Sequence, residues 1–220
     1  MLSQKLLIPQ RTPYALGNTI FTSPWATTWQ RIYRQVFWLS NGRRDVRRIA
    51  TLLHKPEAVI EQVVKELTVG GYTSVQTEGK VLVMDVALLK QSFEMIIPQK
   101  EAFAHSFYQR LFAYYPETRK LFANTNMKKQ EISLLATLAT VVANVERGEN
   151  LTPTLRSLGE RHQHYGTAPD HYPLVGGVLL ETFNEYLGPR FSISMQDAWN
   201  KAFEIMSSHM IAAYTSTHGS

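Results

Sequence analysis

From Asp85 to the end of the chain, apolar residues recur every three or four positions, and no segment alternates convincingly as a β-strand does. In the last such stretch, the residues on one helical face are Trp199, Phe203, Met206 and Met210. Pro98 and Pro116 separate the first helices of this region. About seven helices packed together can bury a sizeable core. Residues 85–220 are therefore expected to form a mainly α domain.

The composition excludes several kinds of chemistry. The chain has 220 residues and no cysteine, so disulfides, thiolate catalysis, cysteine-ligated zinc and iron–sulfur clusters are ruled out. Any metal must be held by His, Asp, Glu or Tyr. No apolar run approaches the roughly 20 residues that span a bilayer. The first residues also lack the features of a secretory signal, so we expect a cytoplasmic protein that does not contact a membrane.

The positive charge is concentrated in the first part of the chain. Residues 1–88 carry 11 Lys+Arg against 6 Asp+Glu, a net charge of +5, whereas the remainder carries 12 against 12. Three helical stretches between Trp29 and Leu67 are followed by two β-prone runs, YTSVQT and KVLVMD, which Glu78-Gly79 separates as a hairpin turn. This order predicts a small winged-helix-like α+β domain over residues 29–84. Residues 1–28 contain three prolines and are expected to form an extended arm.

A winged-helix order suggests DNA binding, but the charges of the third helix disfavour it. In a helix-turn-helix the second helix of the pair enters the major groove. The outward residues expected on that helix here are Glu57, Glu61, Gln62, Lys65 and Glu66. Three carboxylates against one lysine would face the phosphate backbone unfavourably. The pattern therefore favours a protein-docking or self-association module over a DNA-binding one.

Few residues of the helical region can carry chemistry. Leu151, Leu155, Leu158 and His162 fall on one face of a helix. A histidine at the end of an apolar stripe points inward, where it needs either a hydrogen-bond partner or a metal. From the residues alone both uses stay open. Tyr172 lies at the start of the next helix and could orient His162.

Two further polar groups are expected opposite this histidine. Gln130 lies on one face of a long helix with Leu134, and Tyr108 lies on the same face as apolar residues of an earlier helix. Each could be a solvent-facing or core residue. Together with His162 they would form an apolar site with few polar groups and no carboxylate, which favours a haem or gas-ligand site over a hydrolytic one.

Two stretches of the chain resemble the haem domain of flavohaemoglobins and single-domain bacterial haemoglobins. SFYQRLFAYYPETRKLFANTNMKKQ resembles the second helix of these globins and the corner after it. SLGERHQHYGTAPDHYPLVGGVLLETFNEYLGPRF resembles the stretch that carries the proximal histidine and the following helix. The resemblance covers about residues 86–215 and implies a globin fold with haem b as cofactor.

The resemblance also implies roles for individual residues. His162 would be the proximal ligand of the haem iron, and Tyr172 its hydrogen-bonding neighbour. Tyr108 and Gln130 would be the distal pair that hydrogen-bonds dioxygen. The remaining residues expected at the haem are Phe122 on its face, Leu134 and Leu158 as apolar wall, and Arg161 at a propionate. Whether His164 or His171 reaches the iron stays open.

This sequence departs from the flavohaemoglobin pattern in two ways. The last helix of those proteins carries a carboxylate that completes the proximal network, but the corresponding IAAYTSTHGS has none. No flavin or nicotinamide fingerprint is present, so a separate reductase is expected. We expect reversible binding of dioxygen, or of NO or CO. The alternatives are nitric oxide dioxygenation, sensing through residues 29–84, and a globin fold that has lost its haem.

Overall fold

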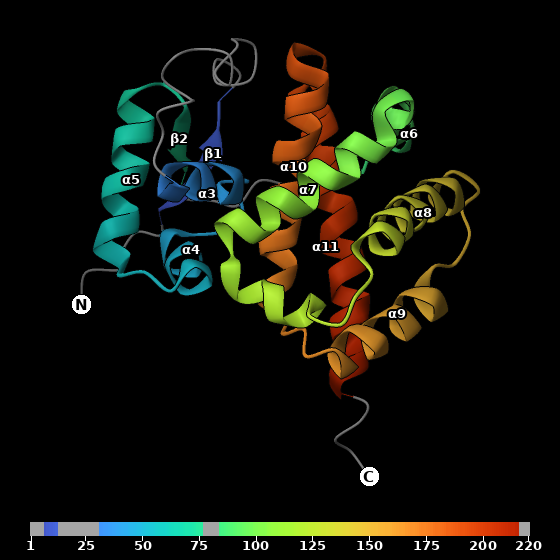
Figure 1. The fold of residues 1–220 in the computed structure, drawn as a ribbon. Helices are drawn as coiled ribbons and strands as arrows, with labels where there is room; N and C mark the ends of the chain where they lie inside the picture. The colour runs from blue at the N-terminus through green and yellow to red at the C-terminus, as the bar shows by residue number, and fades with distance from the viewer. Residues whose placement is uncertain (1–6, 13–30, 77–83, 216–220) are drawn as a thin grey trace. The chain divides into compact units, whose positions relative to one another are not determined.

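A computed structural model of the chain describes residues 7–12, 31–76 and 84–215. The described residues are mostly helical (Figure 1), which confirms the mainly α fold predicted from the periodicity. None of the helices in these ranges is both long and apolar enough to cross a membrane.

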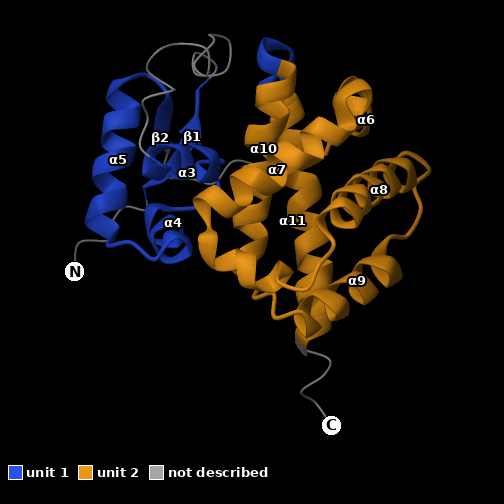
Figure 2. Cartoon of the chain, in the orientation of Figure 1, with its two compact units in different colours: residues 1–82, 188–193 blue, residues 83–187, 194–220 orange. Residues whose placement is uncertain are grey.

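The chain divides into two compact units (Figure 2). Unit 1 comprises residues 1–82 together with residues 188–193, and unit 2 comprises residues 83–187 and 194–220. The first division falls close to the expected domain boundary after residue 84. The assignment of residues 188–193 to unit 1 is a tertiary feature that helical periodicity does not reveal.

The described part of unit 1 contains three α-helices where the sequence pattern predicts them. These are α3 (Arg31–Leu39), α4 (Val46–Leu53) and α5 (Glu57–Val69). Asp45 caps α4, because its side chain accepts a hydrogen bond from the Arg48 amide at 2.7 Å. His54 ends the helix in the left-handed conformation with φ of 50°. The buried apolar residues of the three helices include Val36, Ile49, Leu52, Ile60 and Leu67.

A two-stranded antiparallel sheet completes the described part of unit 1. Strand β1 (Ile8–Arg11) pairs with β2 (Thr73–Gln76), with Ile8 opposite Gln76. The chain segment expected to be an extended arm therefore contributes a strand. The turn at Glu78-Gly79 and most of the run after it lie outside the described residues, so the winged-helix interpretation stays a prediction.

Unit 2 contains six α-helices within the described residues. They are α6 (Val86–Ile96), α7 (Lys100–Tyr114), α8 (Met127–Glu146), α9 (Thr152–His164), α10 (His171–Leu187) and α11 (Ile193–Thr215). Its short helices are η1 (Ile97–Gln99) and η2 (Pro116–Phe122), and η3 (Gly188–Arg190) lies in the segment assigned to unit 1. Asn126 caps α8 by accepting a hydrogen bond from the Lys129 amide at 3.0 Å. This cap sets where α8 starts, and so where Gln130 lies.

The core of unit 2 is built around large aromatic side chains from α7, α10 and α11. The ring of Phe183 lies 4.9 Å from that of Phe103 and 4.7 Å from that of Trp199. Trp199 satisfies its indole N–H by donating to the Ser92 hydroxyl at 2.8 Å. These contacts hold α7 against α10 and α11, and thereby position the residues that α7 presents elsewhere.

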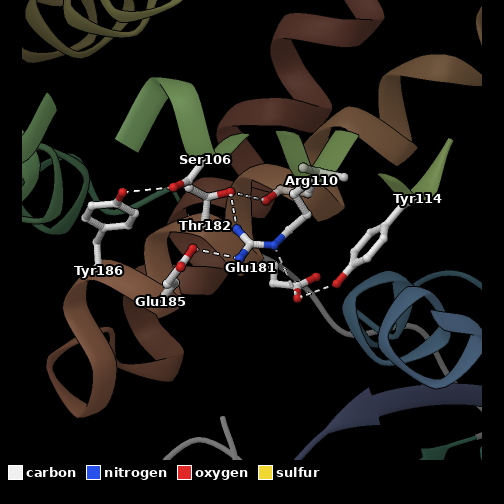
Figure 3. A network of polar contacts seen from close by, with 8 residues as sticks. Ser106, Arg110, Tyr114, Glu181, Thr182, Glu185 and Tyr186 are labelled. Atoms are coloured by element: carbon white, nitrogen blue, oxygen red, sulfur yellow. Dashed lines mark hydrogen bonds and ion pairs between the residues drawn. The ribbon is translucent and has the colours of Figure 1, made fainter. Parts of the chain in front are cut away.

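A polar network also joins α7 to α10 (Figure 3). Arg110 donates to Glu185 at 2.7 Å and to the Thr182 hydroxyl at 3.1 Å. Tyr114 donates to Glu181 at 2.7 Å, and this carboxylate is only 3% exposed. Such charge-assisted bonds restrict how one helix can slide along the other. They therefore fix the level of Tyr108, two residues before Arg110, relative to α10.

Candidate functional site

Tyr108 on α7 and Gln130 on α8 lie together, as the sequence predicts. The Gln130 amide Nε2 donates to the Tyr108 hydroxyl oxygen at 3.1 Å. Tyr108 is only 5% exposed, and burial raises the pKa of its phenol to about 12. The phenol is therefore neutral at physiological pH. Because its oxygen accepts from Gln130, the hydroxyl hydrogen is left without an acceptor among the described residues.

Phe122 at the end of η2 belongs to the same cluster. Its ring centroid lies 5.6 Å from that of Tyr108 and 5.4 Å from that of Phe112, both in edge-on arrangements. Such packing holds the phenol ring of Tyr108 from one side. Leu134 follows Gln130 by four residues on α8 and is half-buried. The structure thus brings Tyr108, Phe122 and Gln130 together and places Leu134 one helical turn further on.

His162 lies in the last turn of α9 and is half-buried. Its Nδ1 is 2.9 Å from the backbone oxygen of Leu158. A carbonyl oxygen can only accept, so Nδ1 carries the proton and Nε2 keeps its lone pair. Nε2 has no hydrogen-bond partner within the described ranges. Burial, aided by the positive charge of Arg161, lowers the pKa of His162, so the imidazole is neutral.

Tyr172, at the start of α10, lies beside His162. The two ring centroids are 6.2 Å apart and the ring planes differ by 30°. The Tyr172 hydroxyl lies 2.8 Å from that of Tyr214 on α11, and Tyr214 donates to the backbone oxygen of Thr167 at 3.0 Å. Sequence reasoning missed Tyr214. The available signal was a tyrosine in the segment IAAYTSTHGS, four residues after Met210 at the helical spacing of the last stretch.

Gly159 was also missed, and it controls how closely α9 approaches α11. A Cβ atom at this position would lie 2.3 Å from the backbone oxygen of Met210 and 2.7 Å from its Cα. Only glycine permits that approach without a shift of backbone. Gly159 precedes His162 by three residues and so lies on nearly the same face of α9. This contact therefore positions the histidine.

The remaining candidate residues are placed less specifically. Leu158 is half-buried on α9, whereas Arg161 is exposed and donates to the Ser157 hydroxyl of its own helix at 3.1 Å. His164 is exposed, and His171 accepts a hydrogen bond from the Ala168 amide through Nδ1 at 3.1 Å. The structure therefore presents His162, and neither of the other two histidines, as a half-buried imidazole with an open Nε2.

These donors fit a metal that is held mainly by a prosthetic group. The described part of the chain contains no group of three or more His, Asp or Glu side chains that could hold a bare metal ion. A single neutral imidazole with its second nitrogen committed to a carbonyl is the usual axial ligand of haem iron. The turn after α9 also lies near η2, because a Cβ on Gly166 would be 3.5 Å from the Leu121 side chain. This brings the segment after His162 close to the segment that carries Phe122.

Comparison with known proteins shows which proteins this region resembles. Residues 105–210 match the family model described as globin. A flavohaemoprotein of Bacillus subtilis is 29% identical over 128 residues, which cover 57% of this chain and 32% of the relative. A flavohaemoprotein of Vibrio cholerae is 27% identical over 120 residues, covering 54% and 30%. The chain thus spans about a third of the length of these curated relatives.

Solved structures show the same fold. A bacterial globin from Campylobacter jejuni has a TM-score of 0.53 at 23% identity, covering 61% of this chain and 97% of the globin. A Pseudomonas aeruginosa protein described as highly homologous in structure to human haemoglobin has a TM-score of 0.53 at 25% identity, covering 59% and 97%. Residues 105–210 therefore have a globin fold similar to that of bacterial globins, and the match implies haem as the cofactor.

Proposed function

We propose that residues 85–220 bind haem b through Nε2 of His162 and reversibly bind dioxygen, or another diatomic gas such as NO or CO, beside Tyr108 and Gln130. The observation that carries the proposal is the protonation pattern of His162. Its Nδ1 proton points to the Leu158 oxygen at 2.9 Å, which leaves a neutral, half-buried nitrogen to ligate iron.

On the distal side, Tyr108 and Gln130 would hold the gas. Gln130 occupies the oxygen of the Tyr108 hydroxyl, so the hydroxyl hydrogen is directed elsewhere. Haem iron supplies the chemistry, because it binds diatomic gases and places partial negative charge on dioxygen. A neutral phenol in a buried setting donates to that charge without itself losing a proton.

Apolar and basic residues complete the proposed haem site. Phe122, Leu134 and Leu158 would contact the porphyrin, which explains why apolar side chains at these positions are only half-buried within the protein. Arg161 is exposed next to His162 and would pair with a propionate.

A visible absorption series on the full chain tests the proposal. Purified protein is mixed with haemin and recorded as ferric, dithionite-reduced and CO-bound forms. A five-coordinate ferrous spectrum that shifts on CO binding supports an iron with one protein ligand and an open distal position. Bands of free haemin alone would contradict the proposal and leave a globin fold without its cofactor.

Nitric oxide dioxygenation is the second candidate function. It is favoured by the relatives named flavohaemoproteins, a name that joins a flavin to a haem. In this case a flavin-containing reductase, expected as a separate protein, must supply electrons to His162-ligated haem. Nitrate formed from NO by the oxygenated protein, in amounts that depend on added reductase, distinguishes this activity from reversible binding.

We propose that residues 29–84 bind a protein partner or a second copy of the chain rather than DNA. The exposed residues of α5 include Glu57, Glu61 and Glu66, which would repel a phosphate backbone. If the binding of a gas to the haem alters the binding of this partner, the protein acts as a sensor. Partner capture or self-association measured with and without CO decides between a sensor and a simple carrier.

A further inference from the structure

We infer that Tyr214 is a positioning residue for His162, and that with Tyr172 and the Thr167 carbonyl it forms an uncharged hydrogen-bond relay favouring reversible gas binding over oxidative chemistry. The inference rests on the proposed function, because it concerns the same haem ligand. It adds Tyr214, which the proposed function does not include, and it states how Tyr214 affects His162.

The direction of each hydrogen bond in the relay follows from its last member. The Thr167 backbone oxygen can only accept, so the Tyr214 hydroxyl donates to it at 3.0 Å. The single Tyr214 proton is then committed, and its oxygen accepts from Tyr172 at 2.8 Å. The relay therefore runs in one sense, from Tyr172 through Tyr214 to Thr167.

The relay meets His162 at both ends. At one end, the Tyr172 ring lies 6.2 Å from the imidazole with the planes 30° apart. At the other end, the Thr167 amide donates to the backbone oxygen of His162 at 2.9 Å. Tyr214 thus ties α11 both to the aromatic neighbour of the imidazole and to the backbone of the histidine itself. Its loss should therefore loosen the orientation of His162.

The groups that the relay offers are neutral. Tyr172 donates to a phenol, and the Nδ1 of His162 donates to the carbonyl of Leu158. The relay packs against the imidazole without a hydrogen bond to it, so a carboxylate at position 214 would act as a nearby negative charge, which raises the basicity of the ligating imidazole. A phenol and a carbonyl provide much less of this effect.

The experiment compares holoprotein of the wild type with Tyr214→Phe, Tyr214→Glu and, as matched control, Tyr165→Phe, whose side chain is 62% exposed. The readouts are the iron–histidine stretching band of the reduced protein, the ferric/ferrous midpoint potential, and amide hydrogen exchange at Thr167. None of these measures activity.

We expect Tyr214→Phe to shift or broaden the iron–histidine band and to speed exchange at Thr167, with little change in potential, because no charge is added. Tyr214→Glu should raise the band frequency and lower the midpoint potential, since a carboxylate then accepts from Tyr172. Tyr165→Phe should match the wild type in all three readouts.

Two results would overturn the inference, and they are distinguishable. If wild type and Tyr214→Phe bind haem with the same band and the same exchange, Tyr214 does not position His162, while the proposed function stands. If the wild type itself shows no iron–histidine band, the proposed function fails and the inference fails with it. Should the Glu variant not fold, the Phe variant and the exchange measurement still decide.

Discussion

The two tyrosine sites of unit 2 use the same phenol group in opposite ways. On the side of α7 and α8, Tyr108 accepts a hydrogen bond from Gln130 and keeps its own hydrogen available. On the side of α9, α10 and α11, the Tyr172 and Tyr214 hydroxyls are joined in series, and Tyr214 donates to a backbone oxygen. Tyr108 keeps its hydroxyl as a donor for a ligand, whereas Tyr172 and Tyr214 both donate within the protein and so hold the surroundings of His162. The partner of a phenol therefore decides its role more than its presence does.

The largest effect is expected from removing His162, the residue beside which Tyr172 and Tyr214 are joined. We expect His162→Ala to abolish stable haem retention, because it removes the half-buried imidazole whose Nδ1 is held by the Leu158 oxygen and whose Nε2 is open. The measurement is the haem content after gel filtration. His164→Ala is the control, since His164 is exposed and should retain haem like the wild type. Equal retention by the His162 variant would show that another residue ligates the iron.

The next largest effect is expected at Gly159, where α9 meets α11. Gly159→Ala places a methyl group against the Met210 backbone, which cannot move as a flexible side chain can. Overpacking of this kind costs about 1–3 kcal/mol. We expect a lower free energy of unfolding in urea and weaker haem binding, because His162 moves with α9. Glu160→Ala, on the exposed face of the same helix, should change neither.

A smaller effect is expected on the distal side. Tyr108→Phe keeps the ring and its packing against Phe122 but removes the hydroxyl. One lost hydrogen bond is worth on the order of 1 kcal/mol, so dioxygen should dissociate several-fold faster. Stopped-flow displacement of dioxygen by CO measures this rate, with Tyr165→Phe as the control. An unchanged rate would mean that the Tyr108 hydroxyl does not reach the ligand.

The smallest effect concerns pH. Burial raises the pKa of Tyr108 from 10.0 to about 12 in the folded state. The neutral phenol therefore stabilises the fold fully below pH 10, and this contribution is lost as the pH rises through about 12. Phenolate absorbance is measured after rapid pH jumps in the wild type and in Tyr108→Phe. The wild type should show one additional phenol that ionises near pH 12, and this phenol is then Tyr108. A difference centred near pH 10 would show that Tyr108 is solvated.

Much of the site follows from local pattern. The stripe that ends in His162 and the polar exceptions Tyr108 and Gln130 stand out because a helix places every third or fourth residue on one face. The contact between Tyr108 and Gln130 is harder to predict, since it depends on how α7 and α8 cross. The packing of Phe103 against Phe183 holds α7 on α10, and the cap at Asn126 fixes where α8 starts, so the contact depends on residues outside both helix faces.

The features that sequence reasoning missed are of a different kind. Tyr214 matters because α11 returns to the end of α9, and Gly159 matters because the Met210 backbone lies directly against it. Both residues lie at the spacing of an apolar stripe, but that spacing does not say which distant backbone or hydroxyl each of them meets. In unit 1, β1 comes from a proline-containing segment whose partner β2 lies more than 60 residues later, so no local pattern links them.

The sequence by itself determined the helical class and placed His162, Tyr108 and Gln130 on particular helix faces, because helical periodicity and side-chain chemistry act over a few residues. The role of His162 as candidate iron ligand came from the resemblance to bacterial globins. The tertiary structure decided which phenol keeps its hydroxyl hydrogen available and which donates it to a neighbour. It also decided which backbone lies against Gly159 and which distant tyrosine holds the neighbour of His162. These depend on contacts between segments far apart in the chain, where the direction of a hydrogen bond is fixed only when both partners are in place.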